Sequence, residues 1–207
     1  MRPCRCSERP GIHRARGQVD WIEADELGHF EWGYAGFTAM SITLREIEPG
    51  DRDLIAGVAG GPAWRSDIAL WVEYVLDHQN GRRIVLLAFE HGKPVGYGTL
   101  KWASDYVPFL SAGIPEINNL MVAAHARNRG IGTAIIQELE QRARGAGKRS
   151  IGIGVGLYAD YGIAHRLYIR LGFQPDGCGL TYANKPVSPR STVVVDDDLL
   201  LWFTKSL

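Results

Sequence analysis

The residues best suited to chemistry lie in one short segment, from Val122 to Thr133. Within it, Arg127, Gly130 and Gly132 stand in the spacing R-x-x-G-x-G. Glycines let the backbone approach a ligand closely, and the free N–H groups at the start of a helix turn the positive end of its dipole toward an anion. Arg129 adds a second cationic side chain, and guanidinium groups suit a pyrophosphate. The segment therefore predicts a phosphate-binding loop, although a plain helix start that contains glycine explains the spacing equally well.

This loop differs from the sites that hydrolyse nucleotides. It lacks the Gly-Lys-Ser/Thr ending of a P-loop and contains no six-residue G-x-G-x-x-G. Nucleotide triphosphate hydrolysis is therefore disfavoured. Other reactive side chains offer no rival chemistry, because His125 and His165 lack a carboxylate at a triad spacing and Cys178 has no activating neighbour in the sequence. We interpret these three as surface, packing or incidental residues.

The composition of the chain disfavours several classes of partner. Lysine plus arginine number 23, as do aspartate plus glutamate, so the net charge of zero provides no overall field for a nucleic acid or an anionic membrane. Three cysteines are too few for a disulfide framework or a four-ligand zinc site. No apolar run approaches the roughly 18 residues of a membrane span, and the arginine-rich start lacks the apolar part of a secretory signal. We expect a cytoplasmic protein without metal, nucleic-acid or membrane partners.

The elements that must position the loop alternate short β-like runs with helical ones, which is typical of a layered α/β or α+β domain. The expected order is a strand at 42–47, helices at 51–58 and 67–78, strands at 84–89, 94–102 and 116–122, a helix at 131–144, a strand at 151–157, a helix at 163–171, and strands at 179–185 and 192–204. A hairpin turn is expected at 90–93. Residues 105–113 are expected to form a polar and aromatic loop.

The strand expected at 151–157 has an unusual composition. Every second residue is glycine, at Gly152, Gly154 and Gly156, and apolar residues stand between them. Because the side chains of a strand point alternately to its two faces, one face carries almost no side chains. Glycine within a strand often marks a close approach of another group. We expect something to approach this face closely.

The first 39 residues differ from the rest of the chain. Arginines up to Arg16 are followed by an acidic stretch from Asp20 to Glu31, and neither part has a sustained helical or strand period. We expect residues 1–39 to be a disordered or loosely docked extension and residues 40–207 to be the folded domain. Aromatic residues at positions 21, 30, 32 and 37 leave open a partner-binding arm. A chain that starts at Met40 is expected to fold.

From Glu116 to Phe173 the sequence resembles the GNAT superfamily of acetyl-CoA-dependent N-acetyltransferases. Two blocks carry the resemblance in the family's order: the R-x-x-G-x-G loop after a strand that ends in valine, and the run A-x-x-L-Y-x-x-L-G-F from Ala164 to Phe173. The order of expected elements extends the likeness over residues 40–207. Within the family, the segments 154–162 and 195–199 resemble a broad bacterial group of small acetyltransferases. The resemblance implies an α/β (α+β) fold with a mixed, largely antiparallel sheet, about four helices and a splayed strand pair that holds acetyl-CoA.

The resemblance implies acetyl-CoA as the cosubstrate. Backbone N–H groups of the loop would bind its pyrophosphate, and the strand that ends at Val122 would pair with the pantetheine arm. The N–H of Met121 would also hydrogen-bond the thioester oxygen as it gains negative charge. Tyr161 stands where many members have asparagine, which is a departure from the family pattern. The implied cofactor-binding residues are Leu120, Met121, Val122, Arg127, Asn128, Arg129, Gly130, Ile131, Gly132, Thr133 and Tyr161.

Two residues match catalytic positions of the family. Glu116 lies on the strand before the loop, where several members place a general base, and a carboxylate there accepts the proton that an ammonium must lose before attack. The alternative is a carboxylate that faces solvent or binds substrate without proton transfer. Tyr168 falls on the tyrosine of the second block, whose hydroxyl protonates the departing thiolate. Its alternative is packing of the helix on the sheet.

The acceptor side is less defined by the sequence. Asn118 shares the face of Glu116 by the period of two, and we expect it to orient the amine or a water. Asp105, Tyr106 and Asp196 are further substrate-binding candidates. We expect direct transfer, in a ternary complex, to a primary amine of a small molecule, with an aminoglycoside-like antibiotic as a narrower version. A protein or peptide acetyltransferase, a non-catalytic acyl-CoA-binding module and a homodimer all remain open.

Overall fold

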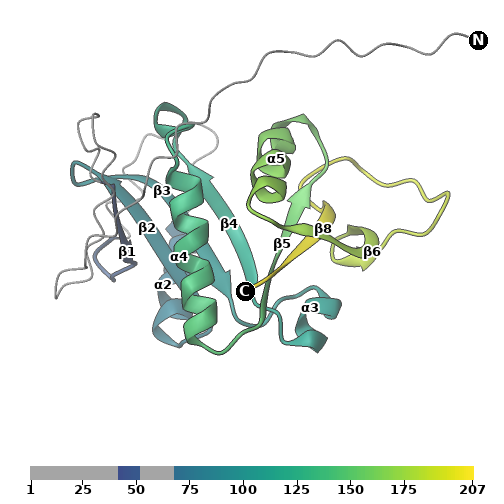
Figure 1. The fold of residues 1–207 in the computed structure, drawn as a ribbon, viewed down its shortest axis with the longest axis horizontal. Coiled ribbons are helices and arrows are strands. Elements are labelled where there is room, and N and C mark those ends of the chain that lie inside the picture. The colour runs from purple at the N-terminus through teal and green to yellow at the C-terminus, as the bar shows by residue number, and fades with distance from the viewer. Residues whose placement is uncertain (1–41, 52–67) are drawn as a thin grey trace, which may run out of the picture.

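The computed structural model of the chain describes residues 42–51 and 68–207 (Figure 1). The extension expected at 1–39 lies outside the described residues, as does the helix expected at 51–58 apart from Asp51. The order of elements within the described ranges follows the expected order closely.

One sheet forms the centre of the described domain. Its eight strands run in the order β1-β2-β3-β4-β5-β8-β6-β7. Every neighbouring pair is antiparallel except β4 and β5, which are parallel. This confirms the expected mixed, largely antiparallel sheet. The strands are β1 (Ile42–Glu46), β2 (Arg83–Glu90), β3 (Lys93–Lys101), β4 (Glu116–Val122), β5 (Ser150–Gly156), β6 (Gln174–Tyr182), β7 (Lys185–Pro186) and β8 (Leu199–Ser206).

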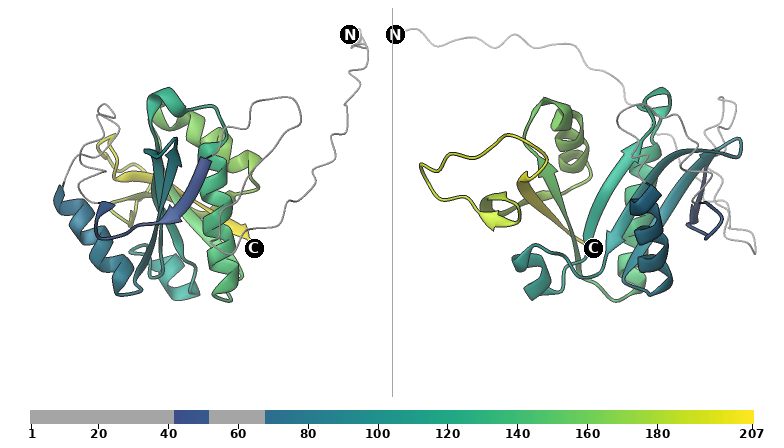
Figure 2. Two further views of the ribbon diagram at one scale, coloured as in Figure 1. Left: turned by 90° about the vertical axis from the view of Figure 1, so that its left-hand side faces the viewer. Right: turned by 180° about the vertical axis from the view of Figure 1, so that it is seen from behind.

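Helices cover both faces of this sheet. The left-hand view of Figure 2 shows α2 on one side of the sheet, with α4 and α5 on the other. Two short 3-10 turns, η1 and η2, precede α4 and α5. The described helical elements are α2 (Ile68–Gln79), α3 (Val107–Ala112), η1 (Ala124–Ala126), α4 (Ile131–Gly145), η2 (Ala159–Tyr161) and α5 (Gly162–Arg170).

The continuous apolar run of β2 reflects burial on both faces. Leu86 and Ala88 pack with the side chains of α4, whereas Val85 and Leu87 pack with those of α2. All four are fully buried. A strand covered on both sides has no need of polar residues at alternate positions, so its sequence lacks the period of two.

The glycine face of β5 is covered by aromatic rings of the chain itself. A Cβ atom built on Gly152 would lie 2.1 Å from Cε2 of Phe109, and one on Gly156 would lie 2.4 Å from Cε2 of Tyr161. At Gly154 the nearest ring is that of Trp202, at 2.9 Å. The close approach expected from the sequence is therefore made by these side chains.

The expected loop at 105–113 contains a helix that the sequence analysis missed. The six-residue α3 has proline in its first turn and ends at Gly113, whose φ of 65° is left-handed. A helix this short has fewer than two full turns, so its apolar residues do not repeat often enough to show a period. Phe109 is its buried residue and places the helix on β5.

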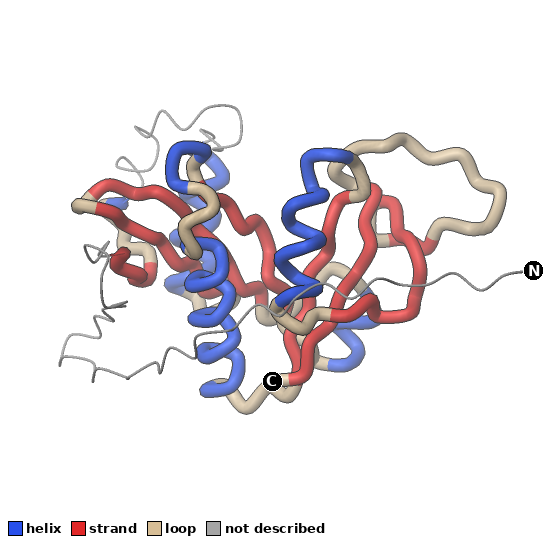
Figure 3. The backbone as a smooth tube through the Cα atoms, turned by 45° about the horizontal axis from the view of Figure 1, so that its top comes forward, coloured by secondary structure: helices blue, strands red, loops and turns tan. Residues whose placement is uncertain are grey.

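The strands expected at 179–185 and 192–204 have different boundaries. β6 begins earlier, at Gln174, and β8 begins later, at Leu199. Residues 187–198 form a long loop instead, which Figure 3 shows as a tan tube leaving the sheet. Val194 and Val195 are 62% and 64% exposed there, because a turn at Asp196 separates them from β8. Their branched side chains imitate a strand without the burial that a strand needs.

Candidate active site

The gap between β4 and β5 is the centre of the site. The two strands pair only at Glu116 with Gly152 and at Ile117 with Ile153. Beyond these positions the strands diverge, as Figure 1 shows, while β4 continues to pair with β3 as far as Val122. The edge of β4 that faces the gap therefore keeps backbone N–H and C=O groups that β5 does not satisfy.

The direction of the backbone amides shows which of them face this gap. Ala123 directly follows β4, and its N–H donates to the O atom of Val95 on β3 at 2.9 Å. Successive N–H groups of a strand point to opposite edges, so the N–H of Met121 also points toward β3, where Tyr97 is its partner in the register. The amides of Leu120 and Val122 point into the gap. The N–H of Met121, expected to face the thioester, points toward β3 instead, and the gap is faced by the N–H groups of its two neighbours.

A bulge in β4 turns two asparagines toward α2. The register with β3 shifts between Tyr97 and Thr99, and Asn119 has a φ of 53°. Asn119 Nδ2 donates to Asn118 Oδ1 at 2.8 Å and also bonds the hydroxyl of Tyr74 on α2. Thr99 Oγ1 donates to Asn118 O at 2.8 Å and holds the bulge. Bulges of this kind re-aim side chains, and here consecutive residues share one face.

The loop between β4 and α4 has the geometry of an anion site. Asn128 and Gly130 both have positive φ, 61° and 83°. The first bond of α4 runs from Ala134 N–H to Gly130 O at 2.9 Å, so the amides of residues 131–133 precede the helical ladder. Such amides, together with the positive end of the helix, favour a phosphate. The predicted residues Gly130, Ile131, Gly132 and Thr133 are therefore brought together in one helix start.

The two arginines of the loop have different roles. Arg129 pairs with Glu90 at the end of β2 through both of its terminal nitrogens, one of them at 3.1 Å. This ion pair ties the loop to the sheet and largely neutralises Arg129. Arg127 is exposed and uses Nε to donate to Val122 O at 3.1 Å. The charge available to a ligand thus comes mainly from Arg127 and from the helix start. No local pattern in the sequence pointed to Glu90.

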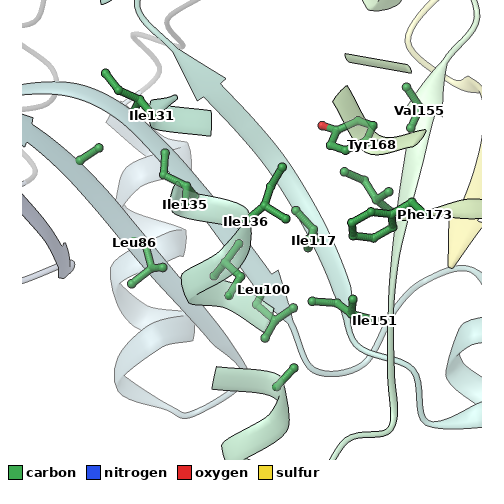
Figure 4. Close-up of a cluster of buried hydrophobic side chains, with 14 of the residues drawn as sticks. Leu86, Leu100, Ile117, Ile131, Ile135, Ile136, Ile151, Val155, Tyr168 and Phe173 are labelled. Atoms are coloured by element: carbon green, nitrogen blue, oxygen red, sulfur yellow. The ribbon is translucent and has the colours of Figure 1, made fainter. Parts of the chain in front are cut away.

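Tyr168 extends from α5 into the apolar cluster of the domain. It is 5% exposed, and its ring centroid lies 5.9 Å from that of Phe173. Burial raises the pKa of Tyr168 above its usual value of about 10, so the hydroxyl keeps its proton at neutral pH. In Figure 4 the hydroxyl oxygen lies on the side of the ring that faces β4. Tyr168 can therefore act as a proton donor toward the gap.

Glu116 lies where β4 and β5 still pair, at the closed end of the gap. It is 6% exposed. Ser104 Oγ donates to Oε2 at 2.5 Å, and Asn118 Nδ2 donates to Oε1 at 2.9 Å. Both oxygens are thus fixed by neutral donors. A carboxylate held in this way can accept a proton directly or through one water.

The remaining predicted residues are used within the chain. Tyr161 donates its hydroxyl to Asp197 at 2.8 Å, and Asp105 pairs with Lys101 at 2.5 Å. Tyr106 is buried and stacks on Trp202 with ring centroids 4.2 Å apart. Asp196 accepts a bond from Tyr182 OH at 3.0 Å. Tyr106 is linked to Glu116 by Ser104, whose Oγ accepts the backbone N–H of Tyr106 at 3.1 Å and donates to Glu116.

Three further features of the described residues bear on ligands. They contain no group of three or more His, Cys, Asp or Glu side chains placed to hold a metal ion. Among the described helices, none combines the length and the apolar character that a membrane crossing requires. A recess of about 340 Å³ is lined by residues of β6, β8 and the turn after α5, none of which is a predicted site residue. Gly172, Gln174, Pro175, Thr204, Lys205 and Ser206 line it.

Solved structures share this fold at low sequence identity. The yncA protein from Salmonella typhimurium, solved with its cofactor acetyl-CoA, is 19% identical, with a TM-score of 0.59 over 80% of this chain and 93% of that one. A ribosomal-protein-alanine N-acetyltransferase from Brucella melitensis is 20% identical, with a TM-score of 0.58 over 79% and 99%. An aminoglycoside 6'-N-acetyltransferase complexed with coenzyme A is 18% identical, with a TM-score of 0.54 over 79% and 96%.

Comparison with sequences gives a more direct assignment. A search of curated proteins found no match. Residues 44–173, however, match the model of the acetyltransferase (GNAT) family. This range is more than half of the chain and includes the β4–α4 loop and the block around Tyr168, which are the two blocks that carried the resemblance. The chain therefore belongs to the acetyltransferase (GNAT) family.

Proposed function

We propose that this chain transfers the acetyl group of acetyl-CoA to a primary amine of a small molecule, by direct attack in a ternary complex. Its family makes it an acetyl-CoA-dependent N-acetyltransferase, as expected from the two sequence blocks. The observation that carries the proposal is the gap between β4 and β5, which has an anion site at one end and Glu116 at the other. We place the enzyme in the bacterial cytoplasm, following the sequence analysis.

The residues that would hold the cosubstrate follow from the geometry of the gap. The amides of residues 131–133 suit its pyrophosphate, and Arg127 adds a positive charge beside them. The open edge of β4 from Leu120 to Val122 suits the amide groups of the pantetheine arm. Bound there, acetyl-CoA supplies an activated acyl group as a thioester. Its carbonyl oxygen would accept the N–H of Leu120, the gap-facing amide nearest to the bulge.

The chain's own groups account for the proton transfers. Glu116 accepts a proton from the acceptor ammonium, directly or through one water, and the neutral amine attacks the thioester carbon. A C–N bond forms, the C–S bond breaks, and Tyr168 donates its proton to the thiolate. The backbone amide at the gap stabilises the charge on the oxygen between these two steps. The second proton that the amine nitrogen loses on becoming an amide passes to solvent, from which Tyr168 regains its own. The products are an N-acetyl amine and coenzyme A.

A compact acceptor is favoured by the burial of the reacting groups. Glu116 and Tyr168 are 6% and 5% exposed, so a slender amine reaches them more readily than a bulky surface does. The fold itself does not distinguish the classes, since solved structures with this fold include both a protein acetyltransferase and an aminoglycoside acetyltransferase. The burial of Glu116 and Tyr168 is therefore the observation that favours a small-molecule acceptor over a protein.

Release of coenzyme A from acetyl-CoA in the presence of a library of amines, aminoglycosides and peptides tests the proposal. Glu116→Gln should lower kcat by about 10²-fold or more with the best amine, on the scale of general base catalysis. Glu138→Gln, the same change on α4, where the carboxylate pairs with Arg142, should have the wild-type rate. Turnover of peptides but not of small amines would reject the small-molecule acceptor. Binding of acetyl-CoA without turnover of any amine would favour a non-catalytic module.

A further inference from the structure

We infer that Arg83 is a positioning residue for the transfer reaction, because it fixes the amide of Asn118, which in turn holds Glu116. This inference rests on the proposed function and adds a residue that lies on β2, two strands away from β4. Arg83 is 6% exposed and belongs to neither block of the sequence that carried the family resemblance.

The contacts of Arg83 determine which way the Asn118 amide points. Arg83 Nη1 donates to Asn118 Oδ1 at 3.2 Å and to Thr99 Oγ1 at 2.9 Å. Asn119 Nδ2 also donates to Asn118 Oδ1. Two donors converge on this oxygen, so the other end of the amide, Nδ2, faces the carboxylate of Glu116. A flipped amide would set N–H groups against two donors and an oxygen against a carboxylate, which is unfavourable at all three contacts.

The other hydrogen bond to Glu116, from Ser104, is oriented by a neutral group. Ser104 Oγ accepts the backbone N–H of Tyr106 at 3.1 Å, so its hydroxyl hydrogen is free to point to Glu116 Oε2. Ser104 therefore needs no cation to orient it. Asn118 differs, because its amide can rotate by half a turn and nothing in its own backbone forbids this. Arg83 is the charged group that selects one of the two orientations.

The placement of Arg83 is costly, which supports a role beyond packing. Its Nε is buried without a hydrogen bond among the described residues and lies 3.5 Å from Asp77 Oδ2. The guanidinium carbon lies 4.7 Å from the centre of the Tyr74 ring. A buried cation with incomplete pairing is seldom favourable for stability by itself. Lys101 lies opposite Glu116 on β3, but it forms an ion pair with Asp105 and does not take over the role of Arg83.

The chain offers a matched control for a test of Arg83. Arg82 is the preceding residue, pairs with the same Asp77 at 2.8 Å and is exposed, but no bond joins it to Asn118. Arg83→Met should lower kcat about tenfold, the scale of one hydrogen bond that serves a charged group, and leave the KM for acetyl-CoA within about twofold. Arg82→Met should leave both constants near wild type. If Arg83→Met fails to fold, Arg83→Gln replaces it with the same expectations.

A double-mutant cycle separates positioning from a structural role. Arg83→Met should cost nothing further in the Glu116→Gln background, because the residue acts through that carboxylate. Equal costs in both backgrounds would overturn the inference while leaving the proposed function intact. A wild-type rate for Glu116→Gln would instead remove Glu116 from the mechanism, and the role of Arg83 with it.

A measurement that needs no turnover completes the test. In ¹⁵N NMR spectra of the full chain, the side-chain amide protons of Asn118 should exchange with water faster in Arg83→Met than in the wild type. The Arg82→Met protein should match the wild type. Unchanged exchange in Arg83→Met would overturn the inference whatever the kinetic result.

Discussion

Gly152→Ala would force a methyl group into the ring of Phe109. The added Cβ would lie 2.1 Å from Cε2 and 2.4 Å from Cζ of that ring, whereas carbon atoms rest at about 3.5–4.0 Å. The ring would have to retreat by about 1.5 Å. Phe109 is fully buried and packs edge-on against Trp202 with centroids 5.2 Å apart, so little space is available for the movement. The backbone of Gly152 is not left-handed, and the strain is therefore purely steric.

The expected cost of this change follows from its burial. Overpacking a well-packed core costs about 1–3 kcal/mol, and a contact with a rigid ring places Gly152→Ala at about 2–3 kcal/mol. For a domain of this size, that loss lowers Tm by about 5–10 °C. Gly145→Ala is the control, because a Cβ there meets nothing within 4 Å and alanine favours the helix. Its Tm should stay constant or rise slightly.

Urea unfolding of four proteins would show whether the Phe109 ring is the cause. The wild type, Gly152→Ala, Phe109→Leu and the double variant form a cycle. If the ring causes the loss, Gly152→Ala should cost much less in the Phe109→Leu background, where the ring is gone. An equal cost in both backgrounds, or a cost under about 0.5 kcal/mol in the wild type, would refute the reasoning from close approach.

Three further predictions concern the site and its tyrosines. Tyr168→Phe should lower kcat about tenfold or more without a change in the KM for acetyl-CoA, since only the acidic hydroxyl is lost. Glu90→Gln should weaken acetyl-CoA binding several-fold in calorimetry, because the loop loses its ion pair with Arg129. The urea midpoint should fall above a pH of about 10, because burial and hydrogen bonds to aspartates raise the pKa of Tyr106 and Tyr161.

The sign of the alkaline effect follows from linkage. Tyrosines of the unfolded chain ionise at a pH of about 10, whereas Tyr106 and Tyr161 do so at a higher pH when folded. The stability that they contribute is complete below the unfolded pKa and is lost as the pH rises toward the folded pKa. A midpoint that is constant from neutral pH to 11 would contradict this. Full activity of Tyr168→Phe would show that Tyr168 serves only in packing. Unchanged acetyl-CoA affinity of Glu90→Gln would show that the loop does not need its ion pair with Glu90 to bind the cosubstrate.

Local signals explain why much of the fold could be predicted. The helix at Ile131–Gly145 repeats its apolar residues over several turns, and the glycines around it mark the loop directly. Weaker signals gave wrong boundaries where burial, not residue type, decides the structure, as in the exposed valines before Asp196. The partners of the site could not be predicted, because Arg83 meets Asn118 across 35 residues and Glu90 meets Arg129 across 39. Such contacts follow from strand order and register, which no local pattern contains.

β4 and β5 join the two halves of the sheet, β1-β2-β3-β4 and β5-β8-β6-β7, but they pair at only two positions. Backbone hydrogen bonds between these strands therefore contribute little to holding the halves together. One continuous apolar cluster contributes most to joining them, since it includes Leu86 and Ile136 on one side and Tyr168 and Phe173 on the other (Figure 4). Moving β4 and β5 further apart would expose this apolar cluster to water, and moving them closer together would make its side chains overlap. The interior thus acts as a spacer that sets the width of the gap before any ligand arrives. An acyl donor that pairs with the edge of β4 therefore meets strands that are already held apart, and its binding loses less free energy to reorganisation of the protein.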